Sequence, residues 1–357
     1  MAICNKYRNA DAYICGITGV NVNVVQLNIL DYAVIDEGQT AQDALQDTVK
    51  LAQLADELAY KRFWITEHHN VPAFACASPE LLMMQILAKT RRIRLGSGGV
   101  MLPHYSPFKV AENFRLLEAF YPGRVDLGIG NNPGTSSVKK ALNETKSYFL
   151  DYGQSISDVK DYLIENNSEQ RLDSVTAQPS VTTVPEMWLL STSITSAEMA
   201  GEVGMGYTLG AFLLPNAQAI QNAKASVQTY RKSFKHTKLN MAPTVIVTVF
   251  TIVADSEVHA QSLAQALDVW LLGKKQFAEF NRMPSITTAQ DYQKSERDEQ
   301  LIKQNRARMV VGTKATVQSQ LEQIIETFDA DELMIVPLIP GFENRSRTIE
   351  LIAEMNL

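Results

Sequence analysis

Residues 93–130 read IRLGSGGVMLPHYSPFKVAENFRLLEAFYPGRVDLGIG, and this stretch predicts the fold. One strand is expected over 93–96 and a second over 124–128. Between them, Ser106 and Pro107 start a helix that we expect to end near Phe120, because a capping residue followed by proline is typical of a helix start. A strand, a helix and a second strand in this order predict one parallel βαβ unit.

The same alternation continues in both directions along the chain. Further strands are expected over 24–30, 62–66, 187–190, 207–209, 244–253 and 332–336, and further helices over 40–60, 78–89, 147–164, 195–203, 217–234, 313–328 and 345–355, with one more helix from 255. These make about eight strand–helix units, which predict a closed (β/α)8 barrel of the α/β class. A doubly wound sheet is the competing fold. Its G-x-G-x-x-G signature would follow the first strand, whereas the glycines of 128–134 are spaced differently and follow the fourth.

Two segments fall outside this alternation. Residues 1–24 are interrupted by Asp, Asn and Gly, and we expect a loosely ordered N-terminal extension before a barrel over 25–357. This extension lacks the apolar core of a signal peptide. Residues 273–308 are charged and rich in Gln, and we expect them to form an excursion inserted into the barrel.

The composition argues against several classes of protein. Lys and Arg number 33 against 39 Asp and Glu, so the net charge of −6 argues against nucleic acid as the main partner. No stretch has the roughly 18 consecutive apolar residues of a membrane span. The three cysteines form neither a C-x-x-C pair nor an even disulfide set, which favours a cytoplasmic location.

Unusual residues follow several of the expected strands. They are Glu67-His68-His69, Ser97-Gly98-Gly99, Gly130-Asn131 and Ser191-Thr192-Ser193. In a (β/α)8 barrel the active site is built at the carboxyl ends of the strands. These four groups are therefore the candidates for chemistry.

The adjacent histidines argue against a metal site. Ligands on one face are two apart in a strand or four apart in a helix, and His68 and His69 are neither. One imidazole at the mouth of the barrel can act as an acid or base near neutral pH. The alternative is a packing histidine with a backbone hydrogen bond. Glu67 can orient a histidine or hold a loop.

The other two groups suit a ligand or an ordinary turn. Gly98 and Gly99 allow a flat ligand close to the backbone, but a simple turn needs the same residues. The hydroxyl-rich run 191–196 enters a helix, whose N-terminus attracts anions such as phosphate, but the same hydroxyls can simply cap the helix. Thr195 with Glu198 predicts a capping box.

Four linked strings carry a family resemblance. They are RFWITEHHN at 62–70, LGSGGVMLP at 95–103, SPFKVAE at 106–112 and PGRVDLGIG at 122–130. In order and spacing the chain resembles the bacterial luciferase-like, flavin-dependent monooxygenases. The resemblance runs from about Val25 to the C-terminus.

This resemblance implies a (β/α)8 barrel with an insertion after the seventh strand. It implies reduced FMN, supplied by a separate flavin reductase, or in one branch the deazaflavin F420. Reduced FMN and O2 would form a C4a-hydroperoxide that oxygenates a small organic substrate. A homodimer is also implied. The alternatives are an F420-dependent oxidoreductase that transfers hydride, and a non-catalytic flavin-binding protein.

The resemblance also assigns roles to residues. It makes His68 the catalytic histidine, with Glu67 beside it, and implies a cis peptide between Gly98 and Gly99 beneath the flavin ring. Thr192, Ser193 and Thr195 match the phosphate-binding run. Asn131 stands at a cofactor-binding position where close relatives have arginine, and Ser136 stands where they have aspartate.

Overall fold

The computed structural model describes residues 25–165, 171–172 and 175–357. The N-terminal extension expected over 1–24 lies outside the described residues. The first half of the chain contains β1 (Gln26–Asp31), α1 (Ala41–Glu57), β2 (Arg62–Ile65), α2 (Pro79–Leu87), β3 (Arg94–Ser97), β4 (Val100–Met101), η1 (Leu102–His104), α3 (Pro107–Phe120), β5 (Val125–Gly130), α4 (Ser136–Leu142) and α5 (Tyr152–Ile164). The second half contains β6 (Glu186–Leu190), α6 (Ile194–Val203), β7 (Gly206–Gly210), η2 (Ala211–Leu213), α7 (Ala217–Ser233), β8 (Val245–Val253), α8 (Glu257–Trp270), η3 (Lys274–Phe277), α9 (Ile286–Asp291), α10 (Glu296–Arg306), β9 (Met309–Gly312), α11 (Lys314–Phe328), β10 (Glu332–Val336) and α12 (Phe342–Ala353).

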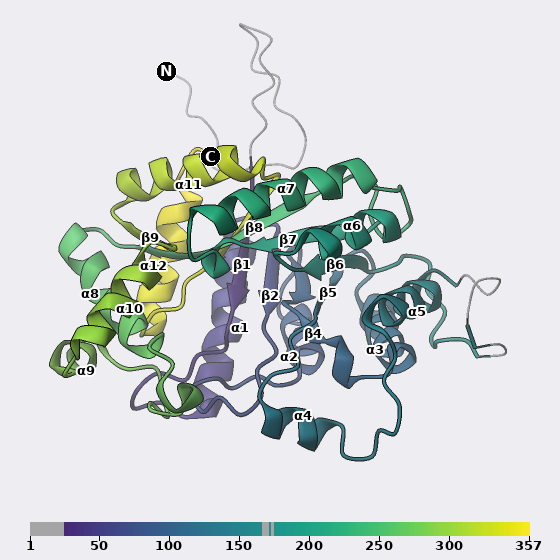
Figure 1. The fold of residues 1–357 in the computed structure, drawn as a ribbon, viewed down its shortest axis with the longest axis horizontal. Coiled ribbons are helices and arrows are strands. Elements are labelled where there is room, and N and C mark those ends of the chain that lie inside the picture. The colour runs from purple at the N-terminus through teal and green to yellow at the C-terminus, as the bar shows by residue number, and fades with distance from the viewer. Residues whose placement is uncertain (1–24, 166–170, 173–174) are drawn as a thin grey trace, which may run out of the picture.

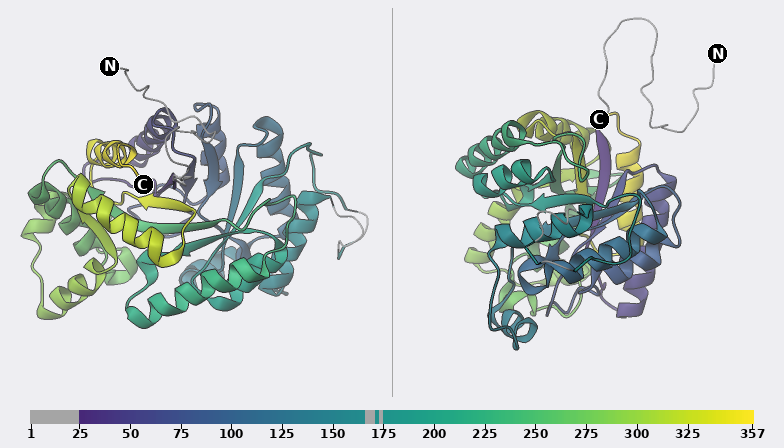
Figure 2. Two further views of the ribbon diagram at one scale, coloured as in Figure 1. Left: turned by 90° about the horizontal axis from the view of Figure 1, so that it is seen from above. Right: turned by 90° about the vertical axis from the view of Figure 1, so that its right-hand side faces the viewer.

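Eight strands close into a parallel barrel. They run in the order β1, β2, β3, β5, β6, β7, β8 and β10, and β10 pairs with both β8 and β1. At the closure, Ile29 of β1 lies opposite Ile335 of β10, and Val249 of β8 also lies opposite Ile335. Helices surround this barrel in the views of Figure 1 and Figure 2. The (β/α)8 barrel expected from the strand–helix alternation is confirmed.

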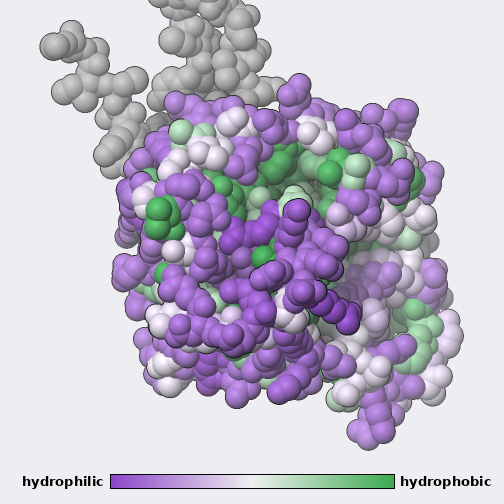
Figure 3. All heavy atoms as spheres, turned by 60° about the vertical axis from the view of Figure 1, so that its left-hand side comes forward, coloured by the Kyte–Doolittle hydropathy of each residue, from purple (hydrophilic) through white to green (hydrophobic). Residues whose placement is uncertain are grey.

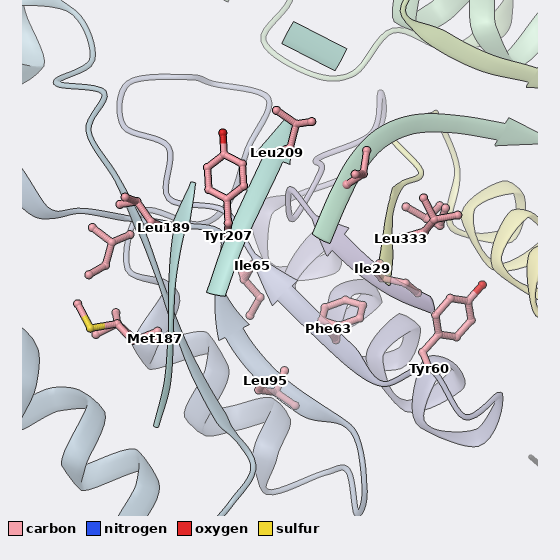
Figure 4. Close-up of a cluster of buried hydrophobic side chains, with 14 of the residues drawn as sticks. Ile29, Tyr60, Phe63, Ile65, Leu95, Met187, Leu189, Tyr207, Leu209 and Leu333 are labelled. Atoms are coloured by element: carbon pink, nitrogen blue, oxygen red, sulfur yellow. The ribbon is translucent and has the colours of Figure 1, made fainter. Parts of the chain in front are cut away.

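Side chains that point outward from the strands form the main core. Figure 4 shows members of this layer, among them Phe63 and Ile65 of β2 and Tyr207 and Leu209 of β7, and all four are fully buried. Residues two apart in a strand share a face, so these side chains pack against the helices while their neighbours point into the barrel.

Two tryptophans fill the inside of the barrel. The rings of Trp64 and Trp188 meet edge to face with centroids 5.7 Å apart. A Cβ on Gly96 would lie 2.4 Å from the Trp64 ring, and a Cβ on Gly206 would lie 2.2 Å from the Trp188 ring. Glycine at these two strand positions therefore makes the space that the tryptophans occupy.

A buried ionic cluster closes the end of the barrel where the strands begin. The Arg62 side chain is 2% exposed and lies 2.8 Å from Asp126 and 2.9 Å from both Glu186 and Glu332. Arg94 adds a second contact to Asp126 at 2.6 Å. Lys61, 2.5 Å from Glu332, is the third cation, so three cations face three carboxylates and the side chains of this cluster fill this end of the barrel.

The longest strand, β8, carries the largest departure from a regular barrel. Its first part pairs with β7 and β10, and its last part, from Phe250 to Val253, pairs with β9. Residues 273–308, between α8 and β9, contain η3, α9 and α10, and Figure 1 shows α9 and α10 at one side of the barrel. Figure 3 brings this side of the molecule toward the viewer, and the surface seen there is mostly hydrophilic.

Two local expectations differ from the structure. The helix expected from 147 begins at Tyr152, because the Asp151 carboxylate accepts the backbone N–H groups of Gly153 and Gln154 and so caps it there. A short helix, α4, was not predicted. Across the described residues, the helices lack the length and hydropathy that crossing a membrane requires.

Candidate active site

The four predicted groups follow strands that are neighbours in the barrel. Glu67 and His68 follow β2, the glycines lie between β3 and β4, Asn131 follows β5, and the hydroxyl-rich run follows β6. Because the strands are parallel, their carboxyl ends meet at one end of the barrel, which we call the mouth. The chain ends at the opposite end, where the Val25 amide donates to the Leu357 carbonyl oxygen at 3.3 Å.

His68 is held at the mouth by three neighbours. Its Nδ1 lies 2.9 Å from the hydroxyl oxygen of Thr66. Its ring stacks on Tyr32 and meets Phe74 at an angle, with centroid distances of 5.0 Å in both cases. Burial, with a smaller effect from His69, lowers the pKa of His68 to about 4. The imidazole is therefore neutral near pH 7, and its Nε2 has no hydrogen-bond partner among the described residues.

The carboxylate of Glu67 binds groups other than the His68 ring. Its Oε1 accepts a hydrogen bond from the Tyr105 hydroxyl at 2.6 Å and lies 2.8 Å from Nε2 of His69. Its Oε2 accepts the backbone N–H of Met101 at 3.0 Å. Burial and this bond to Glu67 both raise the pKa of Tyr105. Glu67 therefore makes contacts that fit both roles that the sequence left open: it orients a histidine, His69 and not His68, and it holds the segment from β4 to α3.

The Gly98–Gly99 segment lies at the carboxyl end of β3, the strand that pairs with β2 and therefore neighbours the loop of His68. The peptide bond between the two glycines is cis, as the resemblance implied, and the Gly98 amide donates to the Ile65 carbonyl at 2.7 Å. A Cβ on Gly98 would lie 2.3 Å from Leu30, and a Cβ on Gly99 would lie 2.8 Å from the carbonyl oxygen of Gly128. Neither position has space for a side chain, so the chain lies flat between its neighbours.

The loop after β5 is fixed by a histidine that the sequence did not single out. Asn131 is exposed, and the carbonyl oxygen of Pro133 accepts a hydrogen bond from Nε2 of His104 at 3.1 Å. On the other side of the ring, the Asn143 amide donates to Nδ1 of His104 at 2.7 Å. His104 therefore joins η1, this loop and α4, and it leaves Asn131 at the surface of the mouth.

The hydroxyl-rich run forms the N-terminus of α6. The Ser193 side chain is the N-cap and accepts the backbone N–H of Ser196 at 3.2 Å, so the capping box expected from Thr195 and Glu198 is wrong. The Ser191 hydroxyl oxygen accepts the backbone N–H of Ser193 at 3.1 Å. Thr192 is half-buried and Thr195 is exposed. The first-turn N–H groups have no intrahelical acceptor, so the terminus suits an anion as well as the cap it already has.

Sequence reasoning missed an aromatic row beside His68. Tyr32 and Phe74 touch the histidine ring, Phe74 packs on Trp270 at 5.0 Å, and Trp270 packs on Phe277 at 4.7 Å between centroids. We call Tyr32, Phe74, Trp270 and Phe277 the aromatic row. Its members come from the loops after β1 and β2, the end of α8 and the start of the excursion. No spacing in the sequence links them, so only the fold brings them together.

A small cavity opens next to the histidine. It has a volume of about 250 Å³ and is lined by His68, Phe74 and other residues of the loop 70–77. Burial raises the pKa of the Cys76 thiol in its wall to about 11, so the thiol is not ionised near neutral pH. In the part of the chain that the structure describes, no three His, Cys, Asp or Glu side chains are grouped to bind a metal ion.

Comparisons with known proteins agree with the resemblance. A model of the luciferase-like monooxygenase family matches residues 26–331. The chain is 41% identical to the uncharacterized protein YwcH of Bacillus subtilis (strain 168), over 93% of this chain and 99% of that protein. It is 30% identical to the N-acetyl-S-alkylcysteine monooxygenase of the same organism, over 93% of this chain and 98% of that protein.

Solved structures share the whole fold. The crystal structure of apo-MsnO8 matches with a TM-score of 0.81 and 32% identity, over 93% of this chain and 97% of that chain. Two structures at lower identity show the fold alone. One is the oxygenating constituent of 3,6-diketocamphane monooxygenase from Pseudomonas putida in complex with FMN, with a TM-score of 0.67 and 16% identity, over 93% of this chain and 97% of that chain. The other is the coenzyme F420 dependent tetrahydromethanopterin reductase from Methanopyrus kandleri, with a TM-score of 0.64 and 14% identity, over 93% of this chain and 98% of that chain.

Proposed function

The chain belongs to the luciferase-like monooxygenase family, and from this premise we propose that it uses reduced FMN and O2 to oxygenate a small organic molecule. The family makes it an oxidoreductase of the monooxygenase kind. The choice of FMN, the C4a-hydroperoxide route, a separate flavin reductase as the transient source of reduced FMN, and the cytoplasmic location are parts of the proposal.

One observation carries the proposal: at the mouth of the barrel a neutral imidazole follows β2, and a backbone segment made of two glycines follows the neighbouring strand β3. His68 is fixed by Thr66, Tyr32 and Phe74, and its Nε2 is available to a reacting group. A neutral imidazole can take a proton from a substrate or hold one at Nε2. Tyr32 and Phe74 of the aromatic row cover part of this ring and contribute to its burial.

The residues at the mouth fit a flavin mononucleotide. The Gly98–Gly99 backbone offers a surface without side chains against which a flat ring system can lie. At the N-terminus of α6, Thr192, Ser193 and Thr195 offer hydroxyl and N–H donors for a phosphate, and Asn131 offers its amide from the loop after β5. When bound, reduced FMN supplies the electrons that activate O2. The protein residues bind it, orient the substrate and keep water away.

The diketocamphane enzyme was solved with FMN, and the tetrahydromethanopterin reductase depends on F420. We favour FMN because Asp and Glu outnumber Lys and Arg by 39 to 33, and a net negative chain does not favour the acidic tail of F420. The neutral Asn131 also motivates a third possibility, a protein that binds flavin without turnover.

The test is rapid mixing of the protein, loaded with reduced FMN under nitrogen, with oxygenated buffer, followed by absorbance. Oxidation much slower than that of free reduced FMN is expected, because a closed site shields the flavin from water. Oxidation at the rate of the free flavin would contradict the proposal for FMN. Reduction or oxidation of F420 with a substrate in the absence of O2 would then support the hydride-transfer alternative.

A homodimer is the second part of the proposal, and α2 and α3 offer a surface for it. Leu81 of α2 is 73% exposed, and Leu116 and Phe120 of α3 are 46% and 62% exposed. The two helices touch where the Asn113 amide donates to the Glu80 carboxylate at 3.3 Å. Exposed apolar side chains grouped on neighbouring helices are typical of a subunit interface.

Phe120→Glu is expected to convert the dimer into a monomer at micromolar concentration, because it places a charge in an apolar interface. Light scattering coupled to size-exclusion chromatography measures the mass. Val258→Glu is the matched control, because Val258 is 79% exposed on α8, away from this surface. A monomeric parent protein, or equal dissociation of both variants, would show that this surface does not form a dimer.

A further inference from the structure

We infer that Arg308 binds the carboxylate of an organic acid substrate at the mouth of the barrel. This inference rests on the proposed function and names the class of molecule that the site takes. Arg308 directly precedes β9, which pairs with the last part of β8. Its guanidinium reaches across to the loop after β7, where one Nη donates to the carbonyl oxygen of Phe212 at 2.9 Å. The group therefore lies between loops that follow adjacent barrel strands.

The charge of Arg308 is not balanced by the protein. The side chain is half-buried, and its partners are the Phe212 carbonyl and the Asn305 side-chain oxygen, both of them neutral. In the described part of the chain, no carboxylate oxygen lies within 4.0 Å of its guanidinium nitrogens, whereas Arg306, two residues earlier, contacts Asp268 at 2.6 Å. Burial lowers the pKa of Arg308, and no acidic group opposes this effect. A half-buried cation without an anion is costly, and an anionic ligand would remove that cost.

The geometry of the remaining donors suits a carboxylate. A guanidinium has five N–H groups in a planar fork, and only two are assigned to Phe212 and Asn305. The remaining donors can bind the two oxygens of one carboxylate, which is the arrangement that arginine forms best.

Packed side chains connect the surroundings of Arg308 to those of His68. Phe212, whose backbone carbonyl oxygen accepts from the guanidinium, packs its ring on Phe250 with centroids 4.6 Å apart. Asn305, which holds Arg308, also reaches the carbonyl oxygen of Leu271, the residue after Trp270 of the aromatic row. The row then leads through Phe74 to His68. We expect an acid to place its carboxylate on Arg308 and its apolar body against the rings nearby, with its reacting part toward His68.

The test compares pairs of ligands that differ only in charge. Phenylacetate and phenylacetamide form one pair, and 4-phenylbutyrate and its amide form a longer one. Calorimetric titration of the full chain, with and without FMN, gives the dissociation constants. In the parent protein we expect at least one acid to bind about tenfold or more tightly than its amide. In Arg308→Gln the two members should bind equally, and Arg308→Lys should keep part of the preference because it keeps the charge but loses the fork.

The matched control is Arg306→Gln, whose side chain is already paired with Asp268, and it should keep the full preference for the acid. Thermal unfolding of each variant shows whether it folds, and Arg308→Lys keeps the comparison valid if Arg308→Gln does not. Equal binding of acid and amide in both pairs, absence of binding by either acid, or an undiminished preference in a folded Arg308 variant would overturn the inference. Flavin oxidation is measured separately. A preference for acids in a protein that oxidises reduced FMN at the rate of the free flavin would keep this site and reject the proposed monooxygenase.

Discussion

His68→Ala is expected to lower the rate of product formation by about 10²–10⁴-fold while leaving the affinity for FMN almost unchanged. The reason is that the imidazole presents an available nitrogen, Nε2, at the mouth, while Thr66 occupies its other nitrogen. The measurement is a single turnover with reduced FMN and isotopically labelled O2, with a substrate found by screening. The affinity for FMN is measured in parallel by quenching of flavin fluorescence.

His69→Ala is the matched control, because His69 is the adjacent histidine but its Nε2 is occupied by Glu67 at 2.8 Å. Its effect on product formation should be much smaller than that of His68→Ala. Equal losses of product formation in the two variants, or a loss of FMN affinity as large as the loss of turnover in His68→Ala, would assign His68 a packing role only.

The burial of His68 also predicts how turnover and stability depend on pH. The pKa of His68 is lowered to about 4 in the folded protein, against about 6.5 in an unfolded chain, so the ring stays neutral through the range near pH 7. Turnover should therefore show no inflection near pH 6.5 from this group. Because the folded state binds the proton less well, the contribution of His68 to stability is present above pH 6.5 and is lost as the pH falls toward 4. The free energy of unfolding should fall less steeply over this range in His68→Ala.

The barrel could be predicted from the sequence because each helix and strand carries its own signals within a few residues. Cap residues such as Ser106 and Thr40, the proline after Ser106 and Ser78, and apolar strands of four to nine residues each report on their own segment. At the start of α1, Thr40 forms a capping box with Asp43, whose carboxylate also accepts the Thr40 backbone N–H. Alternation of such segments leaves few folds to choose from.

The partners of the site residues could not be predicted in the same way. Whether the Glu67 carboxylate reaches His68 or His69 depends on how the chain turns after β2, and its further partners, Tyr105 and Met101, are more than thirty residues away. The aromatic row combines Tyr32 with Trp270 and is joined only by closure of the barrel. Arg308 resembles any surface arginine in the sequence. Only the structure shows that it lacks the carboxylate that Arg306 has.

The ionic cluster inside the barrel was missed for a related reason. Arg62, Asp126, Glu186 and Glu332 stand at or next to the first residue of their strands, where charged residues are ordinarily exposed. In a closed barrel the same positions point inward and meet. The Arg62 guanidinium also lies 4.5 Å from the centroid of the Trp188 ring, so the cluster supports the tryptophan layer above it.

Arg62→Met is expected to lower the free energy of unfolding by about 3–5 kcal/mol, because it leaves buried carboxylates without their main cation. Asp126 is fully buried and Glu332 is 1% exposed, so water cannot replace the lost contacts. This is a large share of the roughly 5–15 kcal/mol that holds a typical domain folded. Urea unfolding followed by circular dichroism gives the change. Arg347→Met is the control, because Arg347 pairs with Asp255 at the surface, where a salt bridge contributes at most about 1 kcal/mol.

The pH dependence of the destabilisation by Arg62→Met identifies its cause. Burial raises the pKa of Asp126 and of Glu332, but Arg62 and its neighbours outweigh that effect, and the pKa of each carboxyl is below its usual range. A carboxyl with a lowered pKa stabilises the fold above its unfolded pKa of about 4, and this contribution is lost as the pH falls below that value. Without Arg62 the carboxyls take up protons more easily, so the deficit of Arg62→Met should shrink as the pH is lowered below 4. If the difference in free energy of unfolding between the parent and Arg62→Met stays constant with pH, lost packing against Trp188 is the cause. Removal of the side chain deletes the same packing contacts at every pH.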